Sequence, residues 1–453
     1  MKTSPVDTCC RVNLIQSSVD EVVEGLKDHI SKCDYQSHDF IIKLHTTIPD
    51  LVVIRAKPKQ NIIADILCNY NVPPNPKCNN IFPNWPKRAE KGWPMSHRAI
   101  MVDRFCGEAV LRGADIFVGG ILCADFGITA GEEIAVYADL RSSNSKSPPR
   151  ALVLEKYFGR CVFLGIGISC CDRSDYFAQS AGVGVRMTRI AGPPQPSLNS
   201  ILPGKMMLQN LPSVCVAHAN PQPGEVILDM CCAPGGKTAH LASLMNNEGM
   251  IIACDRSAKK MFRARDFFLS MGANCIIPLA LDSTKSCLEL EDGQIWKSPR
   301  DIVDTSSCAD DGLLNIKGFY ANSFDKILLD PPCSALGLRP KLIIGTKSSK
   351  ELSKFAEYQR RFVCNAIRLL KPGGTLTYST CTINACENED IVKFIISEYP
   401  NVKLVHIPHE LPGLPGLQCR GLTEEQCQMV RRFDPCDEAD TMGFFLAKFV
   451  KSA

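Results

Sequence analysis

Hydrophobic and polar positions change their spacing twice along the chain. In residues 1–96, apolar residues recur at helical spacing between Val19 and Ile30, and the run Leu51–Ile54 is typical of a strand. Residues 71–94 then hold six prolines in 24 positions, which predicts a linker or stiff loop. We therefore expect a small α+β region that ends in a proline-rich linker at residue 96.

A second stretch, residues 97–190, consists of short β-branched runs separated by glycines. This spacing predicts strands joined by glycine turns, at residues 99–102, 116–118, 133–137 and 160–165. The polar segment 142–149 predicts a turn or exposed loop between them. We expect a compact, mostly β module and refer to residues 97–190 below as the β module.

In the third region, residues 191–453, the pattern becomes strand, helix, strand, helix from Ile201 onward, as in a parallel sheet covered by helices. The predicted strands are residues 225–228, 250–254, 324–329 and 375–378. A helix is predicted over residues 351–370, with Lys-Pro-Gly-Gly at 371–374 as its stop signal. Residues 283–322 are polar and weakly periodic, so we interpret them as an insertion.

Composition favours a soluble globular protein. Hydrophobic residues make up 45% and charged residues 22% of the 453 positions, which excludes wholesale disorder. No apolar stretch approaches the ~18 to 20 residues that cross a bilayer, and the N-terminus lacks the apolar core of a signal peptide, so we expect a cytoplasmic protein. The net charge of +3 means that any nucleic-acid binding must depend on local patches.

Cysteine is unusually abundant, with 24 residues. Disulfide frameworks belong to small secreted domains, and no two cysteines have Cys-x-x-Cys spacing, so we expect neither disulfides nor a zinc or other metal site. Because cysteine is common in this chain, a role can be inferred for a given cysteine only from the residues around it.

A glycine turn joins the strand that ends at Asp229 to a helix predicted over 239–245. Its sequence, MCCAPGGKT at 230–238, brings backbone N–H groups and a helix N-terminus to a ligand. A phosphate loop would need glycine where Cys231 stands, and G-x-G-x-x-G is absent. A ribose-bearing ligand with little phosphate cradling remains, and Asp255 after the next strand is placed to accept from ribose hydroxyls. The alternative is that the glycines only permit close helix–sheet packing.

Two later strands each deliver a cysteine at the carboxyl end. Asp330-Pro-Pro-Cys333 follows one strand and Cys381 follows the other, so both thiols should face one cleft. A thiolate that adds to carbon 6 of cytosine, with a carboxylic acid at ring nitrogen N3, lets carbon 5 attack a sulfonium methyl group. Structural cysteines are the alternative.

These motifs resemble a known family. CCAPGGKT, DPPCSALGLRP, YSTCTI followed by ENED, and RRFDP with GFFLAKF are similar to the Sun-domain RNA cytosine carbon-5 methyltransferases. The β module, with CGEAVLRGADIFVGGI and GVGVRMT, resembles a PUA domain, and its place before LPGKMMLQNLPS resembles the PUA-containing tRNA methyltransferase subfamily. The resemblance implies an α/β fold: a Rossmann-like S-adenosylmethionine methyltransferase core over 191–453, a PUA-like RNA-binding domain over 97–190, and the α+β N-terminal region.

The resemblance also implies residue roles. Cys381 would be the nucleophile, Cys333 would help to release the product, and Asp330 would take part in catalysis. S-adenosylmethionine would be held by Cys231, Cys232, Ala233, Pro234, Gly235, Gly236, Lys237, Asp255, Lys260, Asp282 and Asp330.

Two positions depart from the family pattern, which more often has alanine at Cys232 and Pro332. The resulting Pro-Pro-Cys resembles DNA cytosine methyltransferases, where that cysteine is the nucleophile. The division of labour between the two thiols therefore stays open.

A basic stretch at 339–371 holds nine Lys or Arg against two acids and could neutralise RNA phosphates, although a solvated helix face is the alternative. In the PUA-like module, the resemblance places Arg112 and Gly113 where the domain meets RNA. The expected RNA-binding residues are Arg112, Gly113, Arg339, Lys350, Lys354 and Arg361. The run Glu387-Asn388-Glu389 we interpret only as favouring the next helix through its dipole.

The predicted function is S-adenosylmethionine-dependent methylation of tRNA at cytosine carbon 5. Members of the subfamily act near the acceptor end, which requires the base to be unpaired or flipped. No protein partner can be inferred. A catalytically inactive RNA-binding protein is the alternative, and DNA methylation is disfavoured because the PUA-like module reads RNA.

Overall fold

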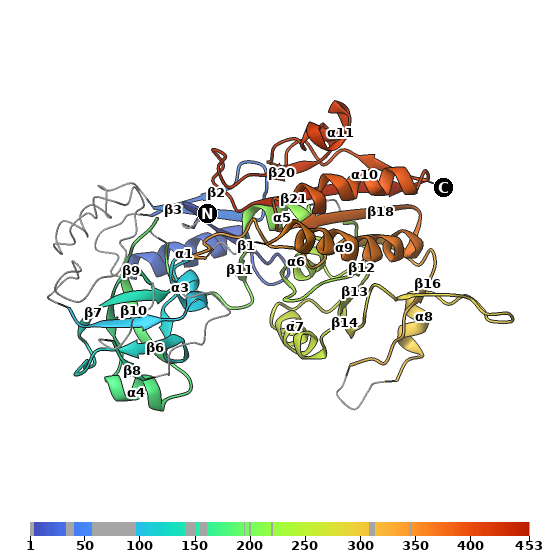
Figure 1. The fold of residues 1–453 in the computed structure, drawn as a ribbon. Helices are drawn as coiled ribbons and strands as arrows, with labels where there is room; N and C mark the ends of the chain where they lie inside the picture. Colours follow the sequence, from blue (N-terminus) through green and yellow to red (C-terminus); the bar gives the residue numbers. More distant parts are fainter. Residues whose placement is uncertain are drawn as a thin grey trace.

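The computed structural model describes residues 4–32, 40–56, 97–140, 151–154, 161–193, 195–198, 201–218, 221–307, 313–343 and 347–452. The predicted linker at 71–94 and loop at 142–149 lie outside these residues. Figure 1 shows the β module at one end of the molecule and a large sheet at the other, with β1 and β11 between them.

A four-stranded sheet contains the N-terminal elements and has the order β11-β1-β3-β2. Its antiparallel strands are β1 (Asp7–Val12), β2 (Phe40–Leu44), β3 (Leu51–Ala56) and β11 (Met206–Leu208). Helix α1 (Val19–Lys32) buries Val22 and Leu26 against this sheet, as its helical spacing predicts. Because β11 comes from the stretch after the β module, the N-terminal region shares a sheet with the region predicted to be catalytic.

The β module folds around a seven-stranded sheet with the order β5-β10-β9-β7-β4-β6-β8. The four predicted runs fall on β4 (Ala99–Val102), β5 (Ile116–Phe117), β7 (Glu133–Asp139) and β9 (Cys161–Ser169). Three strands that were not predicted complete the sheet: β6 (Ile121–Ala124), β8 (Leu152–Val153) and β10 (Val183–Ile190). The module also contains α3 (Arg104–Val110), η1 (Val118–Gly120) and α4 (Arg173–Ala178). Helix α3 begins where the Asp103 side chain accepts from Cys106 N at 2.8 Å.

The large sheet confirms the predicted parallel α/β architecture. Its order is β14-β13-β12-β17-β18-β21-β19, with β20 paired to β21. Five strands are parallel, namely β12 (Val226–Asp229), β13 (Met250–Asp255), β14 (Ile276–Ala280), β17 (Phe324–Leu329) and β18 (Leu370–Thr380). The antiparallel edge consists of β19 (Val402–Val405), β20 (Arg431–Phe433) and β21 (Phe444–Lys451).

Alternate residues of the parallel strands pack into two separate cores, one on each face of the sheet. On β13, Ile252 and Cys254 contact the cluster of α9 (Ser349–Leu369) and α10 (Glu389–Glu398). Ile251 and Ala253 contact the cluster formed by α5 (Leu211–Ala217), α6 (Gly236–Leu244) and α7 (Ala258–Ser270). Because both faces are covered, the carboxyl ends of the strands are the place where the sheet can meet a ligand.

Helix α9 starts with a reciprocal cap, in which Ser348 Oγ accepts from Glu351 N at 3.2 Å and Glu351 Oε2 accepts from Ser348 N at 2.8 Å. The predicted stop signal at 371–374 is not a separate turn. Helix α9 ends at Leu369, and these residues open β18, where the pairing with β17 shifts register.

The predicted insertion at 283–322 has regular structure of its own. It contains α8 (Pro299–Asp304) and a small parallel pair formed by β15 (Cys287–Leu288) and β16 (Phe319–Tyr320). Short helices elsewhere are η3 (Ala385–Glu387), η4 (Gln418–Arg420) and α11 (Glu424–Met429). Among the described helices, none combines the length and apolar character needed to span a membrane.

Candidate active site

The glycine loop after β12 is held by a buried acid. Asp229, 1% exposed, accepts from Thr238 Oγ1 at 2.7 Å and from Cys231 N at 3.2 Å. Burial raises the pKa of Asp229 to about 7. Gly235 has φ +113°, and a Cβ there would lie 2.6 Å from the Phe268 ring, so only glycine fits this close approach. The loop therefore points the N-terminus of α6 at the strand ends.

The two loop cysteines differ from each other. The Cys232 thiol lies 3.6 Å from Met261 Sδ inside the core shared by α6 and α7, and burial raises its pKa. Cys231 is partly exposed and, with Ala233 and Pro234, lines the neighbouring cavity. Cys232 can therefore contribute to a ligand site only through its backbone.

Two acids end the next two strands. Asp255, the last residue of β13, accepts from Ser257 N at 2.9 Å, and Lys260 Nζ lies 3.4 Å from its second oxygen. Asp282, just after β14, accepts from Thr284 N at 3.0 Å and from Thr284 Oγ1 at 2.7 Å. The structure thus places both predicted acids at the edge where the glycine loop lies, whereas Lys260 is 62% exposed.

The two predicted thiols meet. Cys333 Sγ lies 3.3 Å from Cys381 Sγ, because β17 and β18 are neighbouring parallel strands and both loops leave the same edge. The hydrogen bond between them lowers the pKa of Cys381 and raises that of Cys333, and the Lys237 ammonium further favours the Cys381 thiolate. This polarity favours Cys381 as the nucleophile.

Lys237 lies among the predicted catalytic residues. Its Nζ lies 2.5 Å from Asp330 Oδ2, and Ser379 Oγ donates to Asp330 Oδ1 at 3.1 Å. Burial disfavours the ammonium, but the Asp330 carboxylate outweighs it and raises the pKa of Lys237. Asp330, Lys237, Cys333 and Cys381 therefore form one charged and nucleophilic group.

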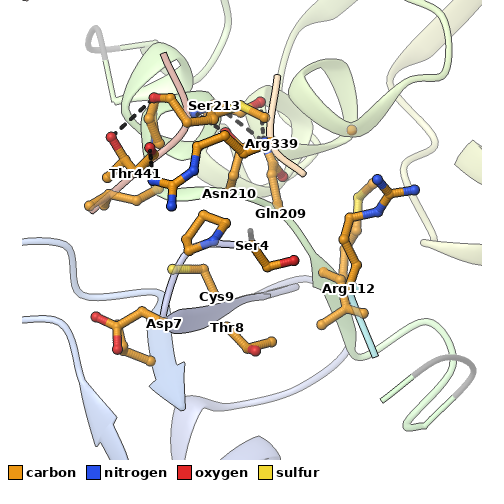
Figure 2. A pocket seen from close by; sticks show the side chains of 18 of the residues that line it. Ser4, Asp7, Thr8, Cys9, Arg112, Gln209, Asn210, Ser213, Arg339 and Thr441 are labelled. Atoms are coloured by element: carbon orange, nitrogen blue, oxygen red, sulfur yellow. Dashed lines mark hydrogen bonds between the residues drawn. The ribbon is translucent and has the colours of Figure 1, made fainter. Parts of the chain in front are cut away.

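A cavity of about 810 Å³ opens beside the glycine loop. Figure 2 shows residues of β1, the residue Arg112 after α3, and the segment Gln209–Ser213 around it. Lys237 and Asp330 also line it, so the N-terminal region, the β module and the large sheet share one cavity.

Arg339 and Arg112 are walls of this cavity, but they differ in their surroundings. Arg339 is 8% exposed and its Nη1 donates to Asp440 Oδ1 at 2.7 Å and to Pro435 O and Thr441 O at 3.0 Å. Arg112 is exposed and follows α3. The neighbouring Gly113 is buried at φ +90°, where a Cβ would lie 3.0 Å from Gln195 Cβ. Arg339 is thus placed as a structural clamp and not as a surface cation.

The basic stretch at 339–371 presents fewer unpaired cations than its sequence indicates. Three of its nine cations are in ion pairs, which are Arg339–Asp440, Arg368–Glu289 and Lys371–Asp325. Lys350, Lys354 and Arg361 lie exposed on α9 and make no ion pair with any residue in the described part of the chain. These three form the free basic face of the helix.

The interpretation of Glu387-Asn388-Glu389 as a simple helix start is wrong. All three residues are 0% exposed; Glu387 and Asn388 bond to the loops that carry the two thiols, and Glu389 accepts from Arg432 on β20. Their position a few residues after a predicted nucleophile was the only signal in the sequence.

A second cluster had no sequence signal. Asp50, between β2 and β3, accepts from His218 Nε2 at 2.8 Å and from His240 Nε2 at 2.7 Å. The ligand atoms of these residues lie within 4.8 Å of one another, as in a metal site. Each carboxylate oxygen already accepts one hydrogen bond, so the group forms a His–Asp–His clasp between the N-terminal region and α6.

Comparison with known proteins gives consistent matches. Residues 216–450 match the family described as 16S rRNA methyltransferase RsmB/F. The tRNA (cytosine(72)-C(5))-methyltransferase NSUN6 of Homo sapiens is 37% identical over 374 residues, which cover 76% of this chain and 74% of the relative. The rRNA (cytosine-C(5))-methyltransferase NOP2C of Arabidopsis thaliana is 34% identical over 441 residues, covering 78% and 73%.

Among solved structures, that of NSun6 from Pyrococcus horikoshii with SFG aligns with a TM-score of 0.68 and 25% identity. The alignment covers 100% of this chain and 92% of that one.

Proposed function

This chain belongs to the RsmB/F methyltransferase family, as its resemblance to the Sun-domain enzymes predicted, and on that premise we propose that it methylates carbon 5 of a cytosine in tRNA, near the acceptor end. The observation that carries the proposal is the meeting of Asp330, Cys333 and Cys381 beside the glycine loop. This group has the acid and the two thiols that the reaction requires.

S-adenosylmethionine is the methyl donor. The donor set fits it, because the Asp255 and Asp282 carboxylates suit ribose hydroxyls and an adenine amine, while the glycine loop offers backbone N–H groups. When bound, it supplies an electrophilic methyl group on a sulfonium. We assign its binding to the loop 231–237, Asp255, Asp282 and Asp330, with Lys260 at the rim.

The chain's own residues perform the remaining steps. The Cys381 thiolate forms a bond to carbon 6 of the cytosine ring, while Asp330 takes a proton from the neighbouring Lys237 ammonium and donates it to N3. Carbon 5 thereby becomes nucleophilic. After methylation, Cys333 helps release the product: carbon 5 loses its proton, the electron pair of that bond forms the carbon 5–carbon 6 double bond, Cys381 leaves as a thiolate, and N3 returns its proton to Asp330. The reaction as written needs no metal ion.

RNA contact is assigned to two surfaces. One is the cavity wall at Arg112 of the β module, beside the buried Gly113, and the other is the basic face of α9 with Lys350, Lys354 and Arg361. Arg339 supports the cavity from inside. We divide the chain into 1–96, the RNA-contacting domain 97–190 and the catalytic domain 191–453, and we place its action in the cytoplasm.

The test is transfer of labelled methyl groups from S-adenosylmethionine to total tRNA, rRNA, duplex DNA or no substrate, followed by sequencing of methylated cytosines in the labelled RNA. Carbon 5 methylation of tRNA near the acceptor end is expected. Label in rRNA alone would move the substrate class towards that of the Arabidopsis relative. RNA binding without any label would support the inactive alternative.

A further inference from the structure

The run Glu387-Asn388-Glu389 lies entirely inside the protein, at the junction of η3 and α10. Burying two carboxylates and an amide is costly unless every polar atom has a partner. Their partners are not those of a helix start. Glu387 and Asn388 bond to the two loops that carry Cys333 and Cys381, and Glu389 bonds to Arg432 and Leu417.

Glu387 holds the Cys333 loop on both sides of the cysteine. Its Oε2 accepts from the backbone N–H of Ser334 at 2.9 Å and from Gln359 Nε2 at 2.9 Å. The same Gln359 Nε2 donates to Pro332 O at 3.1 Å. The residues before and after Cys333 are therefore tied to one buried carboxylate, directly or through one side chain.

Asn388 does the same for Cys381. Its Oδ1 accepts from Thr380 Oγ1 at 2.6 Å, and its Nδ2 donates to Thr382 O at 3.0 Å. The Thr382 hydroxyl lies 2.7 Å from Ser334 Oγ, which links the two loops directly. Cys381 is thus fixed by both of its neighbours, in register with the other thiol.

Glu389 anchors the run to the antiparallel edge of the sheet. It accepts from Arg432 Nη1 at 2.8 and 3.1 Å and from Leu417 N at 3.1 Å. Arg432 on β20 also donates to Ile383 O, two residues beyond Cys381. The carboxyl ends of β17 and β18 are therefore held against β20 by charged hydrogen bonds, which are the stronger kind.

We propose that Glu387 and Asn388 are positioning residues for the two thiols, one for each, with Glu389 as their common anchor. The inference rests on the proposed function for its kinetic consequences, but it makes a geometric claim that is independent of RNA. Because Glu387 serves the releasing thiol and Asn388 the attacking thiol, loss of each should affect a different step.

The variants are Glu387→Gln and Asn388→Asp, which keep the size of each side chain. The glutamine places an N–H donor against the donors that Glu387 accepts from, and the aspartate places an acceptor against the carbonyl oxygen of Thr382. Asp325→Asn is the matched control. Asp325 also accepts from a backbone N–H, Val226 N at 2.9 Å, and from Lys371 Nζ at 2.7 Å, but it lies at the opposite end of the same sheet. If Glu387→Gln does not fold, Gln359→Met tests the same clamp from its other end.

The first readout is cross-linking of Cys333 to Cys381 by a diazene oxidant, which takes two hydrogen atoms from the thiols and is reduced to the hydrazine. Mass spectrometry of the joined peptides measures its rate. Both variants should cross-link about tenfold or more slowly than wild type, as expected for a lost buried charged hydrogen bond. The control should match wild type, because Asp325 lies at the amino end of β17, away from both thiols.

The second readout is the covalent enzyme–RNA adduct on a denaturing gel with tRNA and S-adenosylmethionine. Glu387→Gln should accumulate adduct, and Asn388→Asp should form little. Wild-type cross-linking rates in both variants, or equal slowing in Asp325→Asn, would overturn the positioning role. If wild type methylates no RNA, the proposed function fails, and the cross-linking rates alone decide this inference.

Discussion

The sulfur atoms of Cys333 and Cys381 lie 3.3 Å apart, although 48 positions separate the two residues in the chain. They meet because β17 and β18 run parallel as neighbours and each cysteine follows the carboxyl end of its strand. At this separation both thiols can reach adjacent carbons of one pyrimidine ring. Their hydrogen bond also makes them unequal, since it lowers the pKa of Cys381 and raises that of Cys333.

This inequality predicts variants that differ in kind. Cys381→Ala removes the covalent link to RNA, so neither product nor adduct should form. Cys333→Ala should attack and transfer methyl but stall at release, leaving a nuclease-sensitive, slowly migrating band on a denaturing gel. Cys386→Ala is the control, because its thiol contacts Arg420 at 3.5 Å and lies outside the pair.

The reverse pattern would mean that the two roles are exchanged, as in the DNA enzymes that Pro-Pro-Cys resembles. Full activity of both variants without adduct would leave two structural cysteines.

The strand-end acids predict how the cofactor is bound. Asp255→Ala should weaken S-adenosylmethionine binding by about 10 to 100-fold, since lost charged hydrogen bonds are worth roughly 1.5 to 3 kcal/mol. Titration calorimetry measures this, and ATP and NAD should give no heat. Asp266→Ala on the exposed side of α7 is the control. Tight ATP binding without S-adenosylmethionine binding would contradict the assignment.

The free basic face of α9 predicts a salt-dependent contribution to RNA affinity. Reversal of all three cations to Glu should weaken tRNA binding and flatten its salt dependence by roughly one unit per lost phosphate contact. The three are Lys350, Lys354 and Arg361.

The control carries the same charge change on exposed residues of the insertion, Lys297, Arg300 and Lys317. Filter binding over a salt series compares the two triples with wild type. Equal affinities for all three proteins would show that this face of α9 is only a solvated helix face.

Local sequence was sufficient for the strand ends and their chemistry. Asp330, Cys333 and Cys381 could be placed in one cleft because the carboxyl ends of parallel strands share an edge, whatever the rest of the chain does. The same reasoning was wrong for polar motif residues whose hydrogen-bond partners are distant in the sequence. The sequence predicts Arg339 as part of a basic surface, but the residue is buried, and its guanidinium donates to Asp440, 101 positions away.

The same limit applies to the N-terminal region. Its sheet is completed by β11, and Arg11 reaches Gln209 Oε1 at 2.8 Å, which no periodicity could indicate. Asp50 finds its two histidines 168 and 190 positions later. Such pairs depend on the tertiary fold, so spacing along one chain carries no information about them.

The Asp50–His240 pair predicts how stability depends on pH. Burial lowers the pKa of His240 from 6.5 to about 3, with the Arg11 guanidinium acting in the same direction. For Asp50, burial alone would raise the pKa, but the hydrogen bonds from the two histidines outweigh it and hold the pKa well below its usual value. The folded protein therefore keeps a neutral His240 that donates to a charged Asp50.

The direction of this pH effect follows from the number of protons that the folded and the unfolded chain bind. Between pH 6.5 and about 3, the unfolded chain binds a proton at residue 240 that the folded chain does not. The free energy of unfolding should therefore fall as the pH is lowered through this window, by up to about 1.4 kcal/mol per pH unit from this residue. Asp50 acts in the same direction at the acidic end, because only its unfolded form takes up a proton there.

Urea unfolding of His240→Gln between pH 7.5 and 5 tests this. The variant should be less stable than wild type at pH 7.5, because the buried bond to Asp50 is weakened, and its stability should fall less steeply as the pH decreases. His409→Gln, an exposed histidine, should keep the wild-type slope. Parallel profiles for wild type and His240→Gln would show that residue 240 takes up its proton at the same pH in the folded and in the unfolded chain, and that the clasp does not exclude a proton.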